Sequence, residues 1–263
     1  PGGNGKSLLL RYLHRYICKQ LTAEQWQAAK ALPDGQLADK LATLPGTEHL
    51  PVPSALLDFG LTPLGEVQPR DRFYGLLLLR KSLGESASEK GWRPALPRYD
   101  FACVWYLLQQ GKSTEEIKSL FPLDAAGFVS GLLSAATGSA GGAIVDSLFG
   151  FFGERLGQKF TLYQARLKLG KQDFAAIRGL DVNTDLIDRM PEFLALDLNA
   201  AMAEDGSPER VALFFDTHEA FWNEQRNLPR EQYFLRDEWL RRLLRTLKIE
   251  KGIEAVVSGR EVP

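Results

Sequence analysis

Three short runs of apolar residues stand out from the rest of the chain. They cover Val52 to Phe59, Val211 to Phe215 and Ile253 to Ser258, and the first two end near Asp58 and at Asp216. Apolar runs of this length without alternation are typical of strands that are buried on both faces of a parallel sheet. The sequence therefore predicts three parallel strands, and the long segments between them must carry the connections.

Helical spacing of apolar residues dominates these connecting segments. Helices are predicted from Lys6 to about Gln20, over Arg70 to Leu83 and over about Arg230 to Leu247. Between about Ser86 and Asp205 no strand pattern is found, and helical patterns recur at Tyr99–Gln110, Thr114–Phe121, Gly127–Leu169, Phe174–Leu180 and Met190–Met202. The pattern predicts an α/β fold with a parallel sheet and a large all-helical insertion over about residues 86–205.

Composition and charge narrow the class of protein. The 263 residues include 32 Lys and Arg and 33 Asp and Glu, with 44% hydrophobic and 25% charged residues, as in an ordinary globular chain. A net charge of −1 argues against a broad phosphate-backbone surface, so nucleic acid is not an expected partner. Two cysteines are too few for a disulfide framework or a thiolate metal site, which favours a cytoplasmic location.

The first residues, PGGNGKS, form a glycine-rich turn directly before a predicted helix. They match the end of the G-x-x-x-x-G-K-[ST] motif, in which backbone N–H groups surround phosphates and the helix N-terminus faces the anion. Lys6 would reach the β- and γ-phosphates, and the Ser7 hydroxyl would bind Mg²⁺. The residues predicted to bind the nucleotide are Gly2, Gly3, Asn4, Gly5, Lys6 and Ser7. The alternative is a glycine-rich helix cap with a chance GKS.

The segment FFDTHE follows the second predicted strand. Asp216, at the carboxyl end of a buried parallel strand, lies where ligands bind in open α/β sheets and would hold Mg²⁺ opposite Ser7. Glu219 could orient and deprotonate the attacking water. The alternatives are a helix cap for Asp216 and a helix-dipole role for Glu219. His218, between them, is expected to be a partly exposed loop histidine.

The third motif, VVSGREVP, places Arg260 just after the last predicted strand. A guanidinium there can reach a γ-phosphate and stabilise the charge that develops during phosphoryl transfer. The alternative is a surface arginine. The candidate catalytic residues are therefore Lys6, Asp216, Glu219 and Arg260, and the candidate metal ligands are Ser7 and Asp216.

Taken together, PGGNGKS, VALFFDTHEAFW and EAVVSGRE resemble the STAND class of P-loop ATPases, which are signal-transduction ATPases related to AAA+ proteins and to NLR-type immune receptors. The resemblance implies a three-layer P-loop NTPase fold over residues 1–263, with its first strand before Pro1, so the chain is expected to be truncated at both ends. It also implies a Walker A lysine at Lys6, a Walker B acid at Asp216 and a sensor-strand arginine at Arg260. The chain departs from the usual pair of adjacent Walker B acids, because Thr217 follows Asp216.

By this resemblance, the expected function is an ATP-binding and slowly hydrolysing switch in a multidomain signalling or anti-phage defence protein. ATP would favour a self-oligomer, while sensor and effector domains would lie on segments outside this chain. The alternatives are an AAA+-like ATPase acting on DNA and a nucleotide-binding scaffold without hydrolysis. The uncharged segment Ala125–Val145 is long enough for a membrane span, but its Ala, Gly and Ser content favours a packed helical hairpin.

Overall fold

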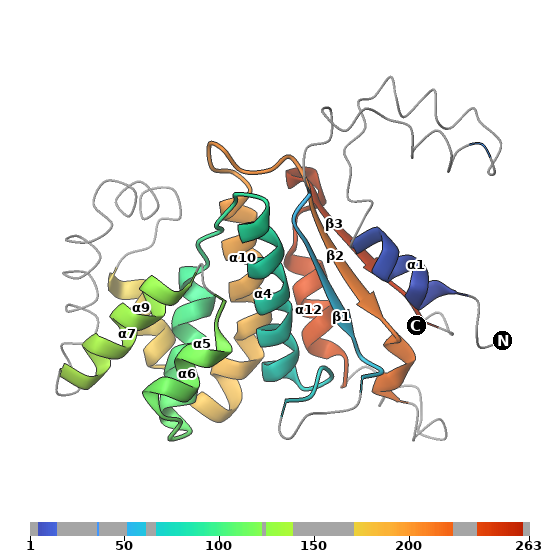
Figure 1. Ribbon diagram of the computed structural model, residues 1–263. Coiled ribbons are helices and arrows are strands. Elements are labelled where there is room, and N and C mark those ends of the chain that lie inside the picture. The colour runs from blue at the N-terminus through green and yellow to red at the C-terminus, as the bar shows by residue number, and fades with distance from the viewer. Residues whose placement is uncertain are drawn as a thin grey trace.

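The computed structural model describes residues 5–14, 36, 52–61, 67–122, 125–138, 171–222 and 236–259. Its described strands form a three-stranded parallel sheet in the order β1-β2-β3 (Figure 1). The strands are β1 (Ser54–Asp58), β2 (Val211–Asp216) and β3 (Ile253–Val257). β1 and β3 lie within two of the predicted runs, and β2 extends its run by one residue to Asp216. The prediction that the last strand is buried on both faces is wrong, because only Ile253 of β3 is buried. The fold is a mixed α/β arrangement with a parallel sheet.

The carboxyl ends of the strands are in register, which brings the residues that follow them to one edge. Asp58 lies opposite Asp216, and the Phe59 N–H donates to the Asp216 carbonyl at 3.0 Å. On the other side of β2, the Ser258 N–H donates to the Phe215 carbonyl at 2.7 Å. At the carboxyl ends of the strands, the residues just beyond the last paired ones therefore form a continuous hydrogen-bonded row. We call this row the sheet rim.

Helices lie on both sides of the sheet (Figure 1). The long α4 (Arg72–Glu89) packs against β1, and α10 (Ile187–Ala201) packs against both α4 and α12 (Glu238–Thr246). The short α1 (Lys6–Tyr12) lies on the other side, where it contacts β2. The predicted helix over Arg70 to Leu83 starts two residues later because the Asp71 side chain caps the N–H groups of Phe73 and Tyr74.

An aromatic cluster fills the space between the sheet rim and α12. Phe59 stacks against Phe215 and contacts Phe221 and Trp239, with ring centroids 4.5–6.2 Å apart. The close approach of α4 to α12 depends on Gly75, where a Cβ would lie 2.9 Å from the Trp239 ring. Rigid packing of this kind fixes the position of the turn that follows β2.

The remaining described helices form a group beyond α4 and α10 (Figure 1). They are α5 (Pro97–Gln109), α6 (Thr114–Leu120), α7 (Ala126–Gly138), α9 (Lys171–Arg178) and the π-helical turn η3 (Val182–Leu186). The described residues between 86 and 205 contain no strand, as the helical spacing predicts. Helix α5 packs against α7, α9 and α10, so this group is joined to the layer that covers the sheet.

A buried polar cluster connects α4, α5 and α10 inside this helical layer. Arg80 donates from Nε and Nη2 to the two oxygens of Asp100, at 3.1 and 3.2 Å. Asp197 is fully buried and accepts hydrogen bonds from the Tyr99 N–H at 3.0 Å and from Arg98 at 3.3 Å. Burial raises the pKa of Asp197 to about 7, against the opposing effect of these hydrogen bonds.

Helix α7 covers the first part of the small-residue segment, and residues 139–145 of that segment lie outside the described residues. Within the described part of the chain, no helix has the length and apolar character needed to cross a membrane.

Candidate functional site

The sheet rim brings together two motifs that lie at opposite ends of the sequence. The Lys6 ammonium donates a hydrogen bond to the Gly259 carbonyl at 2.6 Å, across 253 positions. Gly259 comes directly after β3 and Ser258, and it precedes Arg260. The glycine-rich turn and the third motif therefore meet in space. Arg260 itself lies outside the described residues, as do Gly2, Gly3 and Asn4.

Gly5 gives the start of α1 its backbone geometry. Its φ of 69° and ψ of 8° are left-handed, a conformation that glycine adopts without a steric penalty. A Cβ at Gly5 would contact nothing within 4 Å, so its backbone angles are what favour a glycine at this position. The Leu9 N–H then donates to the Gly5 carbonyl at 2.8 Å, which starts the helix with Lys6 exposed and Ser7 half-buried.

Asp216 ends β2 at the centre of the rim and is 3% exposed. Its Oδ1 accepts a hydrogen bond from the Thr217 N–H at 2.8 Å, and the described residues make no hydrogen bond to its Oδ2. Carboxylate and hydroxyl oxygens are hard donors of the kind that suit Mg²⁺, and Asp216 and Ser7 carry one of each. Among the described residues there is no group of three or more His, Cys, Asp or Glu side chains that could hold a metal ion.

Thr217 has an unusual backbone conformation. Its φ of 56° and ψ of 43° are left-handed, and no other described non-glycine residue has a positive φ. Left-handed geometry is costly for a β-branched residue, so the surrounding contacts must hold it in place. Thr217 starts the short helix η4 (His218–Phe221), which carries Glu219 with 5% of its surface exposed. The predicted base is therefore buried in a turn that begins directly after Asp216.

Asp58 belongs to the candidate site, although its sequence pattern predicted no chemical role for it. Its side chain is 12% exposed and accepts hydrogen bonds from Arg11 at 3.1 Å, from the Thr217 hydroxyl at 2.9 Å and from the Gly60 N–H at 2.9 Å. The available signal was its place at the carboxyl end of a predicted buried strand, which is the same signal that identified Asp216. What the sequence lacked was the contact with Thr217, 159 positions away.

The expectation that His218 is partly exposed is wrong, because it is only 4% exposed. Its Nε2 lies 3.1 Å from Asp237, which also accepts a hydrogen bond from Arg241 at 2.9 Å. Burial alone would raise the pKa of Asp237, but the hydrogen bonds from His218 and Arg241 outweigh it and the pKa is lowered. His218 thus attaches η4 to the start of α12, while its buried Nδ1 has no hydrogen-bond partner in the described structure.

Two arginines also attach η4 to the helical layer. Arg70 donates to the Ala220 carbonyl at 2.9 Å, and Arg236 donates to the Phe221 carbonyl at 3.4 Å. Both line a cavity of about 420 Å³ between the beginnings of α4, α10 and α12. The turn that carries Glu219 is therefore held by polar contacts to Arg70 and to the Arg236–Asp237 segment.

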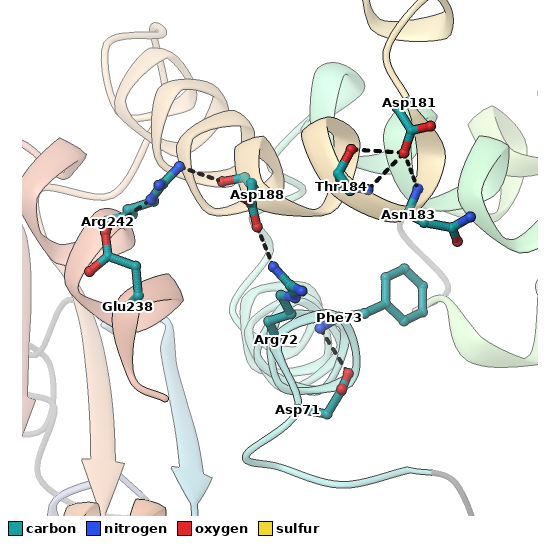
Figure 2. A network of polar contacts seen from close by, with 9 residues as sticks. All are labelled: Asp71, Arg72, Phe73, Asp181, Asn183, Thr184, Asp188, Glu238 and Arg242. Atoms are coloured by element: carbon teal, nitrogen blue, oxygen red, sulfur yellow. Dashed lines mark hydrogen bonds and ion pairs between the residues drawn. The ribbon is translucent and has the colours of Figure 1, made fainter. Parts of the chain in front are cut away.

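Residues that line this cavity also join the three helices. Asp188 of α10 forms an ion pair with Arg72 of α4, and its carbonyl accepts a hydrogen bond from Arg242 of α12 at 3.2 Å (Figure 2). Arg242 also forms an ion pair with Glu238 at 3.1 Å. Arg72 and Arg242 therefore both have acidic partners within the protein.

Comparisons of this chain with known protein families, with curated proteins and with solved structures find no match.

Proposed function

We propose that this chain is the ATP-binding and hydrolysing module of a nucleotide switch of the STAND class of P-loop ATPases. The observation that carries the proposal is the hydrogen bond from Lys6 to the Gly259 carbonyl. It joins the glycine-rich turn to the carboxyl end of β3, next to the strand that ends in Asp216. This is the edge of an open parallel sheet at which ligands bind.

The contacts of Lys6 suggest how phosphates would enter the site. In the structure its ammonium donates to a neutral carbonyl, whereas the phosphates of ATP would offer charged oxygens and a stronger, charge-assisted hydrogen bond. Ser7 and the open oxygen of Asp216 would hold Mg²⁺ directly or through water. The bound ion would neutralise charge on the phosphates during transfer.

Hydrolysis in this proposal depends on Glu219 and Arg260. Glu219 would accept a proton from the attacking water or orient it, which a threonine hydroxyl at position 217 cannot do near neutral pH. Arg260, one residue beyond the carbonyl that binds Lys6, would stabilise the charge on the γ-phosphate. ATP binding would favour a self-oligomer, and sensor and effector domains elsewhere in the protein would supply the trigger and the response in the cytoplasm, in signalling or anti-phage defence.

The proposal is tested by titrating the full-length protein with Mg²⁺-ATP in a calorimeter. Lys6→Ala should weaken binding by about two powers of ten or more, because a charge-assisted phosphate contact is lost. Lys118→Ala, which removes an exposed lysine from α6, is the matched control and should bind as the parent does. Equal affinity in Lys6→Ala and the parent would falsify the assignment. Turnover measured with and without DNA then separates a switch from an ATPase that acts on DNA.

A further inference from the structure

Asp58 is in contact with both halves of the proposed nucleotide site. Its Oδ2 pairs with Arg11 of α1, the helix that follows the glycine-rich turn, at 3.1 Å. Its Oδ1 accepts the hydroxyl hydrogen bond of Thr217, the residue directly after Asp216, at 2.9 Å. One carboxylate therefore divides its two oxygens between the phosphate-binding half and the metal-binding half.

The contact with Thr217 holds a strained backbone. Left-handed geometry is unfavourable for a non-glycine residue, and the hydrogen bonds to Asp58 and Asp216 oppose that cost. The arrangement also depends on glycine at position 60, because a Cβ there would lie 2.8 Å from Thr217 Cγ2, which is too close. The turn that presents Asp216 and Glu219 therefore takes its shape partly from Asp58.

We propose that Asp58 is a positioning residue that couples the helix after the glycine-rich turn to the turn that carries Asp216. The inference rests on the proposed nucleotide function, and Asp58 acts through Arg11 and Thr217 rather than on the nucleotide itself. Arg11 is 58% exposed while Asp58 is 12% exposed, so the carboxylate is the fixed partner and the guanidinium the movable one.

This arrangement makes the binding of Mg²⁺ and ATP depend on each other. When Lys6 exchanges the Gly259 carbonyl for phosphate oxygens, α1 and Arg11 adjust together because they belong to one short helix. Asp58 passes that adjustment to Thr217 and so to the open oxygen of Asp216. Coupling between two ligands is reciprocal, so Mg²⁺ must tighten ATP binding by the same factor by which ATP tightens Mg²⁺ binding.

The experiment measures ATP affinity with and without Mg²⁺, together with kcat, in the full-length protein. Asp58→Ala should reduce the tightening of ATP binding by Mg²⁺ by about tenfold or more and lower kcat by about 10²-fold, as expected for a displaced catalytic turn. ATP affinity without Mg²⁺ should stay within about threefold of the parent, because Lys6 is untouched. Thr217→Val, which lacks the hydroxyl, should behave like Asp58→Ala, whereas Thr217→Ser should behave like the parent.

A double-mutant cycle and the results of the single variants decide between the possible outcomes. In a double-mutant cycle, Asp58→Asn and Thr217→Val should be non-additive, and full additivity would overturn the coupling. An unchanged Mg²⁺ effect in Asp58→Ala, with binding lost in Lys6→Ala, would overturn this inference alone. Absence of Mg²⁺-ATP binding in the parent would overturn the proposed function and this inference together. If Asp58→Ala does not fold, the Thr217→Val and Thr217→Ser pair carries the same test.

Discussion

Glu219 is the residue at which the proposed hydrolysis is most directly tested. Glu219→Gln keeps the size of the side chain and removes its ability to accept a proton, so ATP binding should persist while kcat falls by about 10² to 10⁴. The measurement is steady-state phosphate release beside an ATP titration, with the exposed Glu115→Gln as the control. Hydrolysis at the parent rate would leave Glu219 as a helix cap and transfer the orientation of water to another group, such as His218.

Asp197 makes stability depend on pH without any contact to the proposed site. Its pKa is raised to about 7 by burial, so the folded state keeps a proton that the unfolded chain releases near pH 4. Its contribution is therefore fully present below pH 4 and is lost as the pH rises through 7, at up to about 1.4 kcal/mol per pH unit.

Asp197→Asn mimics the protonated carboxyl group, so its free energy of unfolding should fall less between pH 5 and pH 8 than that of the parent. Urea unfolding at several pH values measures this, and Asp185→Asn, at an exposed position, should keep the parent's pH dependence. A parent-like slope in Asp197→Asn would contradict the assignment of the titration to this carboxyl group.

At the scale of the elements, the contact between α4 and α12 supports the position of η4, the helical turn that follows β2. Gly75→Ala would place a Cβ 2.5 Å from the Pro69 carbonyl and 2.9 Å from Trp239, so the backbone before α4 and the Trp239 ring must both shift. We expect a loss of about 1–3 kcal/mol from overpacking, which exceeds the gain of up to about 1 kcal/mol from better helix propensity. Gly127→Ala in α7, where a Cβ meets nothing within 4 Å, should be neutral or stabilising in the same urea unfolding experiment.

Strand β2 was predictable because both of its faces are covered. Because both faces are buried, the sequence of β2 is a continuous apolar run that ends at Asp216. The register of the parallel strands then places Asp58 beside Asp216. The contacts of Asp58 and His218 were not predictable, because each depends on a partner that tertiary packing brings in. His218 was expected to be partly exposed, and it is buried because it pairs with Asp237 and packs against the rings of Phe221 and Trp222.

At the scale of the whole molecule, the described structure separates the proposed chemistry from the packing that supports it. The described residues of the three motifs lie at or beside the carboxyl end of the sheet, while the buried ion pair of Arg80 and Asp100 lies in the helical layer. Between them, η4 is attached to that layer through Arg70 and His218. Movement of η4 during a nucleotide cycle would therefore shift α12 and α4.

The position of β3 has a practical consequence for handling the protein. It is the last strand of the described sheet, and Val256 and Val257 are each 40% exposed on it. A strand edge that is apolar and has no described neighbour offers its N–H and C=O groups as a template for another strand. Where this edge is not paired with a further strand, copies of the chain would join edge to edge at high concentration, and a lysine in place of Val256 is the kind of charge that natural sheets use to prevent such aggregation.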